Sequence, residues 1–116
     1  MNTEVSRNCH VIDALVDAYN LQDARRFADL FSVDGWHGNL HGESFQIGPD
    51  AIFHRYVEVF TMYPDNRTQV VHRIAFDHFV VDHEKVTRKL GGESFDVVAI
   101  YTLKDGKIKR AELVRK

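Results

Sequence analysis

Residues 97–114, with the sequence VVAIYTLKDGKIKRAELV, place an Asp-Gly pair at 105–106 between two runs of alternating residues. Such a pair between alternating apolar positions is the strongest short-range signal of a β-hairpin with a two-residue turn. It predicts two antiparallel strands in which Tyr101 lies opposite Arg110. The rest of the sheet can be built outward from this hairpin.

The sequence between Pro64 and this hairpin predicts two more antiparallel strands. A turn at Asp77-His78 would place Arg73 opposite Asp82, and a turn at Gly91-Gly92 would lay Asp82 beside Tyr101. Opposed residues share a face of a sheet. One face is therefore expected to carry two rows, the first with Arg73, Asp82, Tyr101 and Arg110 and the second with Val71, Glu84, Ala99 and Glu112.

The opposite face of these strands is predicted to be an apolar patch with a polar border. It carries Val70, His72, Ile74, Phe76, Phe79, Val81, His83, Val98, Ile100, Ala111 and Leu113. Either face could meet the helices, because a one-residue shift in register would exchange their roles. The pattern alone therefore does not say which face is concave.

The first half of the chain predicts helices. Apolar residues recur every three or four positions over 5–19, with Thr3 placed to cap this helix. Asp23 is expected to cap a second, short helix that includes Phe31 and ends at Asp34-Gly35. The sequence then predicts a short hairpin, 36–40 with 43–47, and a third helix from Gly48-Pro49-Asp50 to Tyr63-Pro64.

The composition is that of one folded domain, residues 1–116. Hydrophobic residues make up 44% and charged residues 28% of the chain, and helices followed by strands indicate the α+β class. A net charge of −2, without a basic stripe, argues against a nucleic-acid partner. Cys9 is the single cysteine, and the N-terminal segment lacks the apolar run of a signal peptide or membrane span. We therefore expect a cytoplasmic protein with no membrane partner.

The order of the predicted elements resembles the nuclear transport factor 2-like superfamily and, within it, the SnoaL-like and ketosteroid-isomerase-like branch. The similar motifs are AYNLQDARRFADLFSVDG (18–35), IGPDAIFHRYVEVF (47–60), FVVDHEKVTR (79–88) and the hairpin at 97–114. The resemblance implies a cone-shaped, strongly curved, mostly antiparallel sheet wrapped around helices, with an interior pocket and a homodimer through the outer sheet face. It also implies that Ala99, Tyr101 and Leu103 point into the cone, which by the predicted register turns the charged rows inward.

The resemblance does not extend to the catalytic residues of ketosteroid isomerases. The position of their protonated carboxylic acid falls at or near Ala99, that of their tyrosine near Leu15 or Val16, and that of their general base near Asn39. Alanine cannot donate the hydrogen bond that the acid supplies. The chain is therefore not expected to be a standard ketosteroid isomerase.

The charged rows provide the candidate catalytic residues. With Arg73 holding Asp82 ionised, Asp82 or Glu84 could act as a general base, while Tyr101 and Arg110 polarise a substrate. The alternative is an internal salt-bridge network without chemistry, since buried ion pairs can be neutral for stability and still persist.

The candidate substrate-binding residues are Trp36, Tyr56, Phe60, Ala99 and Glu112. Trp36 and Tyr56 are favoured because each combines an aromatic ring with a polar group. Together with Phe45, Phe53 and Phe60 they are expected to form aromatic walls, and plain core packing is the alternative.

Two histidine pairs raise the question of a metal site. His72 and His83 are expected opposite each other at a dimer contact, and His37 and His41 at the mouth of the pocket. A structural zinc site needs four ligands and a catalytic site three protein ligands, and neither pair has an obvious third. No metal is expected, and no cofactor, because the sequence has no glycine-rich phosphate loop and no paired cysteines.

Two functions remain open from the sequence. The first is a cofactor-independent isomerase, dehydratase or hydrolase that uses acid/base chemistry on a small hydrophobic molecule. The second is a non-catalytic, dimeric ligand-binding or scaffold domain. The two differ in whether the cone encloses a cavity of the roughly 300 to 1,000 Å³ that small ligands need.

Overall fold

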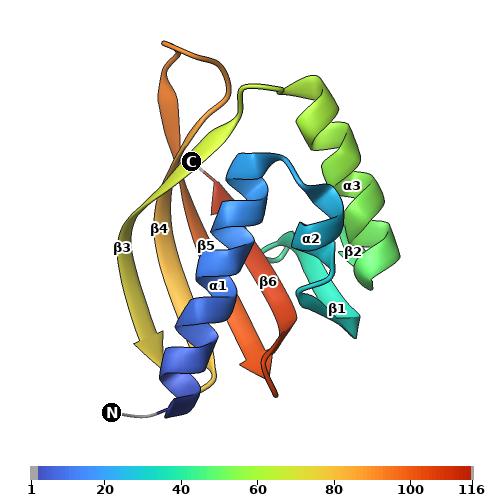
Figure 1. Cartoon of the computed structure of the whole chain (residues 1–116), viewed down its shortest axis with the longest axis vertical. Helices are drawn as coiled ribbons and strands as arrows, with labels where there is room; N and C mark the ends of the chain where they lie inside the picture. Colours follow the sequence, from blue (N-terminus) through green and yellow to red (C-terminus); the bar gives the residue numbers. More distant parts are fainter. Residues whose placement is uncertain (1–2, 116) are drawn as a thin grey trace.

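The computed structural model describes residues 3–115, and within this range the chain folds as a curved sheet with its helices on one side (Figure 1). The helices are α1 (Thr3–Leu21), α2 (Ala24–Ala28) and α3 (Pro49–Met62). The strands are β1 (Phe31–Asn39), β2 (Phe45–Ile47), β3 (Arg67–Phe76), β4 (Phe79–Thr87), β5 (Ser94–Lys104) and β6 (Lys107–Arg115). The expected α+β class is confirmed.

The strands form one sheet in the order β2-β1-β6-β5-β4-β3. Only the β1–β6 pair is parallel among the described strands, and the other neighbours pair antiparallel. The parallel pair arises because β1 returns to the sheet beside the last strand instead of joining the meander. The sheet is mostly antiparallel, as expected.

Local sequence signals explain where the helices begin. The Asp23 side chain accepts a hydrogen bond from the backbone N–H of Arg26 at 3.0 Å, so the predicted cap of α2 is confirmed. α3 begins at Pro49, directly after Gly48, whose φ of 89° suits a residue without a side chain. Thr3 was predicted to cap the first helix, but it lies inside α1.

The prediction that the second helix includes Phe31 and ends at Asp34-Gly35 is wrong. α2 ends at Ala28, and Phe31 opens β1, where it pairs with Ile108 of β6. A buried apolar residue such as Phe31 fits either a helix or a strand, so its sequence pattern does not distinguish the two. The backbone pairing with β6 makes it a strand residue. The predicted hairpin is confirmed, since Trp36 pairs with Ile47 and Gly38 with Phe45.

The predicted register is confirmed between β3 and β4 near their turn. Arg73 pairs with Asp82, His72 with His83 and Phe76 with Phe79. A register shift between Val70 and His72 then places Val70, and not Val71, opposite Glu84. One extra residue in one strand of a pair is a β-bulge, which periodicity does not predict.

The predicted register is wrong on both sides of β5. Asp82 pairs with Ala99 and not with Tyr101, because a longer loop replaces the predicted turn at Gly91-Gly92 and joins Thr87 to Ser94. The shift is two residues, so Tyr101 keeps its predicted face. Between β5 and β6 a bulge places Ala111, and not Arg110, opposite Tyr101. That shift is one residue and exchanges the two faces of β6.

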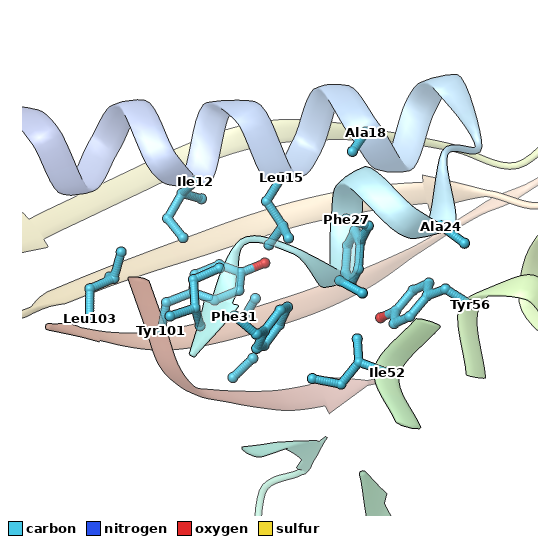
Figure 2. Packing of buried hydrophobic residues seen from close by; sticks show 14 of the residues in the cluster. Ile12, Leu15, Ala18, Ala24, Phe27, Phe31, Ile52, Tyr56, Tyr101 and Leu103 are labelled. Atoms are coloured by element: carbon cyan, nitrogen blue, oxygen red, sulfur yellow. The ribbon is translucent and has the colours of Figure 1, made fainter. Parts of the chain in front are cut away.

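The main core lies between α1 and the concave face of the sheet. Ile12 and Leu15 of α1 point toward Tyr101 and Leu103 of β5, as Figure 2 shows, and each is at most 5% exposed. The spacing of three residues between Ile12 and Leu15 puts both on one side of the helix. Burial of such side chains stabilises the fold by about 1.5–3 kcal/mol each. Ala99, Tyr101 and Leu103 therefore face inward, as the resemblance implied.

None of the helices within residues 3–115 is long and apolar enough to cross a membrane.

Candidate functional site

A cavity of about 820 Å³ lies between the helices and the concave side of the sheet, and it is open on one side. Its wall includes Leu15, Val16 and Tyr19 of α1, Phe27 of α2, and Arg55 and Tyr56 of α3. The sheet contributes His37, Thr68, Glu84, Val97, Tyr101 and Leu113, among others. This volume lies within the range of small-molecule sites.

Glu84 is the buried carboxyl group of this wall. Its side chain lies on the inner face of β4, it is 7% exposed, and Oε1 accepts a hydrogen bond from the Thr68 hydroxyl at 2.7 Å. Burial raises the pKa of Glu84, the Thr68 hydrogen bond opposes this, and the nearby Asp82 carboxylate adds to it. Within residues 3–115 no arginine, lysine or histidine forms an ion pair with Glu84. The group can therefore hold or release a proton inside the cavity.

Tyr101 lies on the inner face of β5 and also lines the cavity. Burial raises the pKa of its phenol well above 10, and the Glu84 carboxylate adds to this effect. The phenol therefore keeps its proton and serves as a hydrogen-bond donor at neutral pH. The Tyr101 side chain also lowers the pKa of Glu84, but burial, which raises it, has the larger effect.

Asp82 lies on the same face of β4 but does not line the cavity. It is completely buried, and Arg73 donates to it twice, from Nε to Oδ1 at 2.7 Å and from Nη2 to Oδ2 at 3.0 Å. Arg73 also donates from Nη1 to Asp13 of α1 at 2.7 Å. The predicted pairing of Arg73 with Asp82 is present, but it connects β3, β4 and α1 beside the cavity.

The predicted inward positions of Arg110 and Glu112 are wrong. The bulge in β6 turns both side chains to the outer face, where the Nε of Arg110 lies 3.2 Å from Oε1 of Glu112. The Arg110 guanidinium carbon lies 4.0 Å from the centre of the Trp36 ring. These residues do not line the cavity.

Of the predicted substrate-binding residues, Tyr56 lines the cavity and Trp36, Phe60 and Ala99 do not. Trp36 stacks on Phe45 on the outer side of β1, with ring centres 5.5 Å apart. Phe60 packs against Tyr19 and Tyr56, and Ala99 is completely buried in the core. Core packing, the alternative that the sequence left open for the aromatic residues, describes Phe60.

His37 and Tyr56 form a second polar group in the wall. The sequence placed His37 at the pocket mouth, but its side chain is 6% exposed. Nδ1 lies 2.9 Å from Gln46 Oε1 and Nε2 lies 2.7 Å from the Tyr56 hydroxyl. An amide oxygen can only accept, so Nδ1 carries the proton and the Tyr56 hydroxyl donates to Nε2. Burial lowers the pKa of His37, which keeps the ring neutral.

Several wall residues were missed by the sequence interpretation, among them Tyr19, Gln46, Thr68, Arg88 and Arg115. By alternation Thr68 shares the face of Val70, which the sequence placed on the outer side, and the bulge between Val70 and His72 turns both residues inward. Arg88 directly follows β4, and nothing in the local pattern marks it as part of an interior wall.

Neither predicted histidine pair gathers metal ligands. Within residues 3–115 one group brings three possible ligand atoms to within 4.8 Å of one another, and it consists of Glu4, Asp77 and His78. Asp77 and His78 are exposed and Glu4 is partly exposed, and none of the three lines the cavity.

A mostly antiparallel curved sheet with helices over an interior cavity defines a nuclear transport factor 2-like fold. The family model of the SnoaL-like domain matches residues 12–111, which is most of the chain. The protein therefore belongs to the SnoaL-like domain family, as the motifs suggested. None of the functionally curated proteins matches this sequence at a significant level.

Solved structures agree with this fold. An uncharacterized cystatin-fold protein from Novosphingobium aromaticivorans is 27% identical, with a TM-score of 0.85 over 93% of this chain and 97% of that one. A provisionally named ketosteroid isomerase from Kribbella flavida is 19% identical, with a TM-score of 0.81 over 96% and 78% of the two chains. A provisionally named polyketide cyclase from Sinorhizobium meliloti is 18% identical, with a TM-score of 0.79 over 90% and 94%.

Proposed function

We propose that the cavity binds a small molecule and that Glu84 exchanges a proton with it. The observation that carries this proposal is a buried carboxyl group in the cavity wall, hydrogen-bonded to Thr68 and without a cationic partner among the described residues. Two structures of the same fold are named as a polyketide cyclase and a ketosteroid isomerase, and these names support binding of a small molecule. The predicted base is therefore Glu84, and Asp82 is assigned to structure.

The proposed step is a proton transfer with Glu84 as carrier. The Glu84 carboxylate removes a proton from carbon next to a carbonyl group and becomes the carboxylic acid, while the carbonyl oxygen gains negative charge. The Tyr101 phenol donates a hydrogen bond to that oxygen, since its raised pKa keeps it protonated. Glu84 then returns the proton to a different carbon, which completes an isomerisation and restores the carboxylate.

His37 and Tyr56 provide a second point of contact for a ligand. The Tyr56 hydroxyl, which donates to His37 Nε2, can still accept a hydrogen bond from a ligand hydroxyl. Because the His37 ring is held by Gln46 on its other nitrogen, the position of the Tyr56 hydroxyl is fixed. The pair thus orients a ligand without taking a proton from it.

Exchange of substrate hydrogen for deuterium tests the proposal before the natural reaction is known. A panel of small cyclic and unsaturated ketones is incubated with the protein in D₂O, and mass spectrometry follows deuterium uptake. Glu84→Gln is expected to lower the exchange rate by roughly 10²–10⁴-fold, the usual contribution of a general base. Glu112→Gln is the matched control, because Glu112 lies on the outer face. Equal rates for Glu84→Gln and the unchanged protein would contradict the assignment.

A second candidate function is ligand binding without catalysis. It is favoured by the side chains at the positions of the ketosteroid isomerase catalytic residues, namely Ala99, Asn39 and Leu15 or Val16, which supply no acid or base. Mass spectrometry of small molecules released from the purified protein tests binding alone. A tightly bound compound that is recovered unchanged after long incubation would favour this second function.

We also propose that the outer face of the sheet forms a homodimer. Ile74, Phe76 and Phe79 are 58%, 75% and 43% exposed there, next to the partly buried Val81 and Ile100. Contiguous exposed apolar side chains on a sheet face are typical of protein–protein contacts. His72 and His83 pair at the same surface, as predicted from the register.

A further inference from the structure

The cavity wall contains arginines that the protein does not neutralise. Arg55, Arg88 and Arg115 all line the cavity, and within residues 3–115 none of them forms an ion pair with a carboxylate. The other arginines near a carboxylate behave differently: Arg73, for example, is paired with both Asp82 and Asp13. Arg88 is partly buried, while Arg55 and Arg115 are exposed at the open side of the cavity, so their guanidinium groups are available to an anionic ligand.

Arg88 and Arg115 meet at one aromatic ring. The guanidinium carbon of Arg115 lies 4.1 Å from the centre of the Phe95 ring, and that of Arg88 lies 5.1 Å from it. Arg88 also lies 4.3 Å from the centre of the Tyr63 ring. Its Nη1 is covered by protein and has no hydrogen-bond partner. Aromatic rings hold both guanidinium groups in place but do not cancel their charge.

The carboxyl groups of the same wall do not offset these arginines. The wall contains Glu58 and Glu84 as its acidic residues. Glu84 accepts a hydrogen bond from Thr68 and forms no ion pair with an arginine among the described residues. Glu58 forms no ion pair with an arginine among the described residues. The wall thus has an excess of positive charge at the end formed by β4, β5 and β6.

We propose that the ligand of this cavity carries a carboxylate group, which binds at Arg88 and Arg115 beside Phe95. Arginine is suited to this because its planar guanidinium can donate two parallel hydrogen bonds to a carboxylate. The apolar body of the ligand then lies along Val97 and Leu113 toward Tyr101. The proposal of a carboxylate ligand rests on the proposed function in one respect, namely that the ligand binds in the cavity. It adds the chemical class of that ligand.

The test compares two probes of the same shape, 2-naphthoate and 2-naphthamide, by isothermal titration calorimetry. The unchanged protein is expected to bind the carboxylate at least tenfold more tightly than the amide. Arg88→Met and Arg115→Met should each remove most of this preference while the amide affinity changes less than twofold, and Arg88→Lys should keep part of it. Arg26→Met, at an exposed position of α2, is the matched control.

Other results would overturn the proposal. It fails if the unchanged protein binds both probes equally, if it binds neither at millimolar concentration, or if the preference survives in both methionine variants. If Arg88→Met does not fold, two other measurements test the proposal. Arg115→Met should lose the preference for the carboxylate, and the unchanged protein should lose it in high salt, because salt screens the attraction between arginine and carboxylate. Glu84→Gln is expected to retain the preference. Failure of the proton-transfer step and failure of carboxylate binding are therefore distinguished.

Discussion

Arg73 holds Asp82 by two hydrogen bonds, at 2.7 and 3.0 Å, at a point where the Asp82 side chain has no exposed surface. Glu84, two residues along the same strand and on the same face, has no such partner among the described residues and lines the cavity. One strand thus presents two carboxyl groups in different environments. The first stabilises the contact of β3, β4 and α1, and the second is available to a ligand.

Replacing Asp82 is expected to destabilise the fold strongly. Asp82→Asn leaves the partly buried Arg73 without its main partner, and breaking a buried pair in this way costs about 3–5 kcal/mol. Asp13→Asn is the control, because Asp13 is 58% exposed and its pair with Arg73 should contribute less than about 1 kcal/mol. Urea unfolding of both variants measures the difference. Equal losses of stability would show that the buried pair is not structural.

Replacing Glu84 is expected to stabilise the protein at neutral pH. Because the folded state raises the pKa of Glu84, folding favours its protonated form, and ionisation of the group above its usual value of about 4.3 opposes folding. Glu84→Gln removes this penalty, so its melting temperature should exceed that of the unchanged protein at pH 7. The gain should shrink as the pH falls toward about 4.3, the usual glutamate value, and should be absent below it. A gain that is the same at both pH values, or a loss at pH 7, would contradict this.

Acid is expected to destabilise the protein through His37. The pKa of His37 is lowered in the folded state by burial, so the unfolded state binds the proton more readily, and stability falls as the pH drops below about 6.5. His37→Gln should therefore show a smaller loss of unfolding free energy between pH 7.5 and 5 than the unchanged protein. His41→Gln, at an exposed position, should lose as much unfolding free energy over this pH range as the unchanged protein. Parallel curves for the two variants would rule out His37 as the acid-sensitive group.

A charge on the outer face of the sheet is expected to break the proposed dimer. Ile74→Glu places a carboxylate in the apolar patch of β3 and should shift the protein to the monomer in size-exclusion chromatography. Val33→Glu is the control, because Val33 is 89% exposed on β1, far from β3 in the strand order. A monomer for the unchanged protein at all concentrations, or a dimer for Ile74→Glu, would disprove this interface.

The sequence predicted the elements of the fold well because the turn and cap residues act locally. Asp77-His78 set the pairing of Arg73 with Asp82, and Asp23 set the start of α2. The sequence also predicted correctly that Tyr101 points inward. The predicted register at the Gly91-Gly92 turn was wrong by two residues, and a shift by an even number leaves each side chain on the same face of the sheet. Local signals and alternation were enough for these features.

The site was predicted only in part because it depends on bulges and on tertiary contacts. The bulge in β6 moved Arg110 and Glu112 to the outer face, and no periodic pattern could have placed it. Glu84 lines the cavity and Asp82 does not, and Asp82 is instead held by Arg73 of β3, which also contacts Asp13 of α1. The contribution of Arg88 depends on the loop after β4, which the sequence described only as a turn.

Direct titration of Glu84 tests best whether it is a buried acid that takes up and releases a proton at the cavity. Carboxyl ¹³C NMR of the labelled protein, with Glu84→Gln to assign the signal, follows the ionisation of this one group. We expect a midpoint above the usual glutamate value of about 4.3. A midpoint at or below that value would mean that Glu84 is ionised and solvated like a surface residue, and the proposed proton transfer would be contradicted.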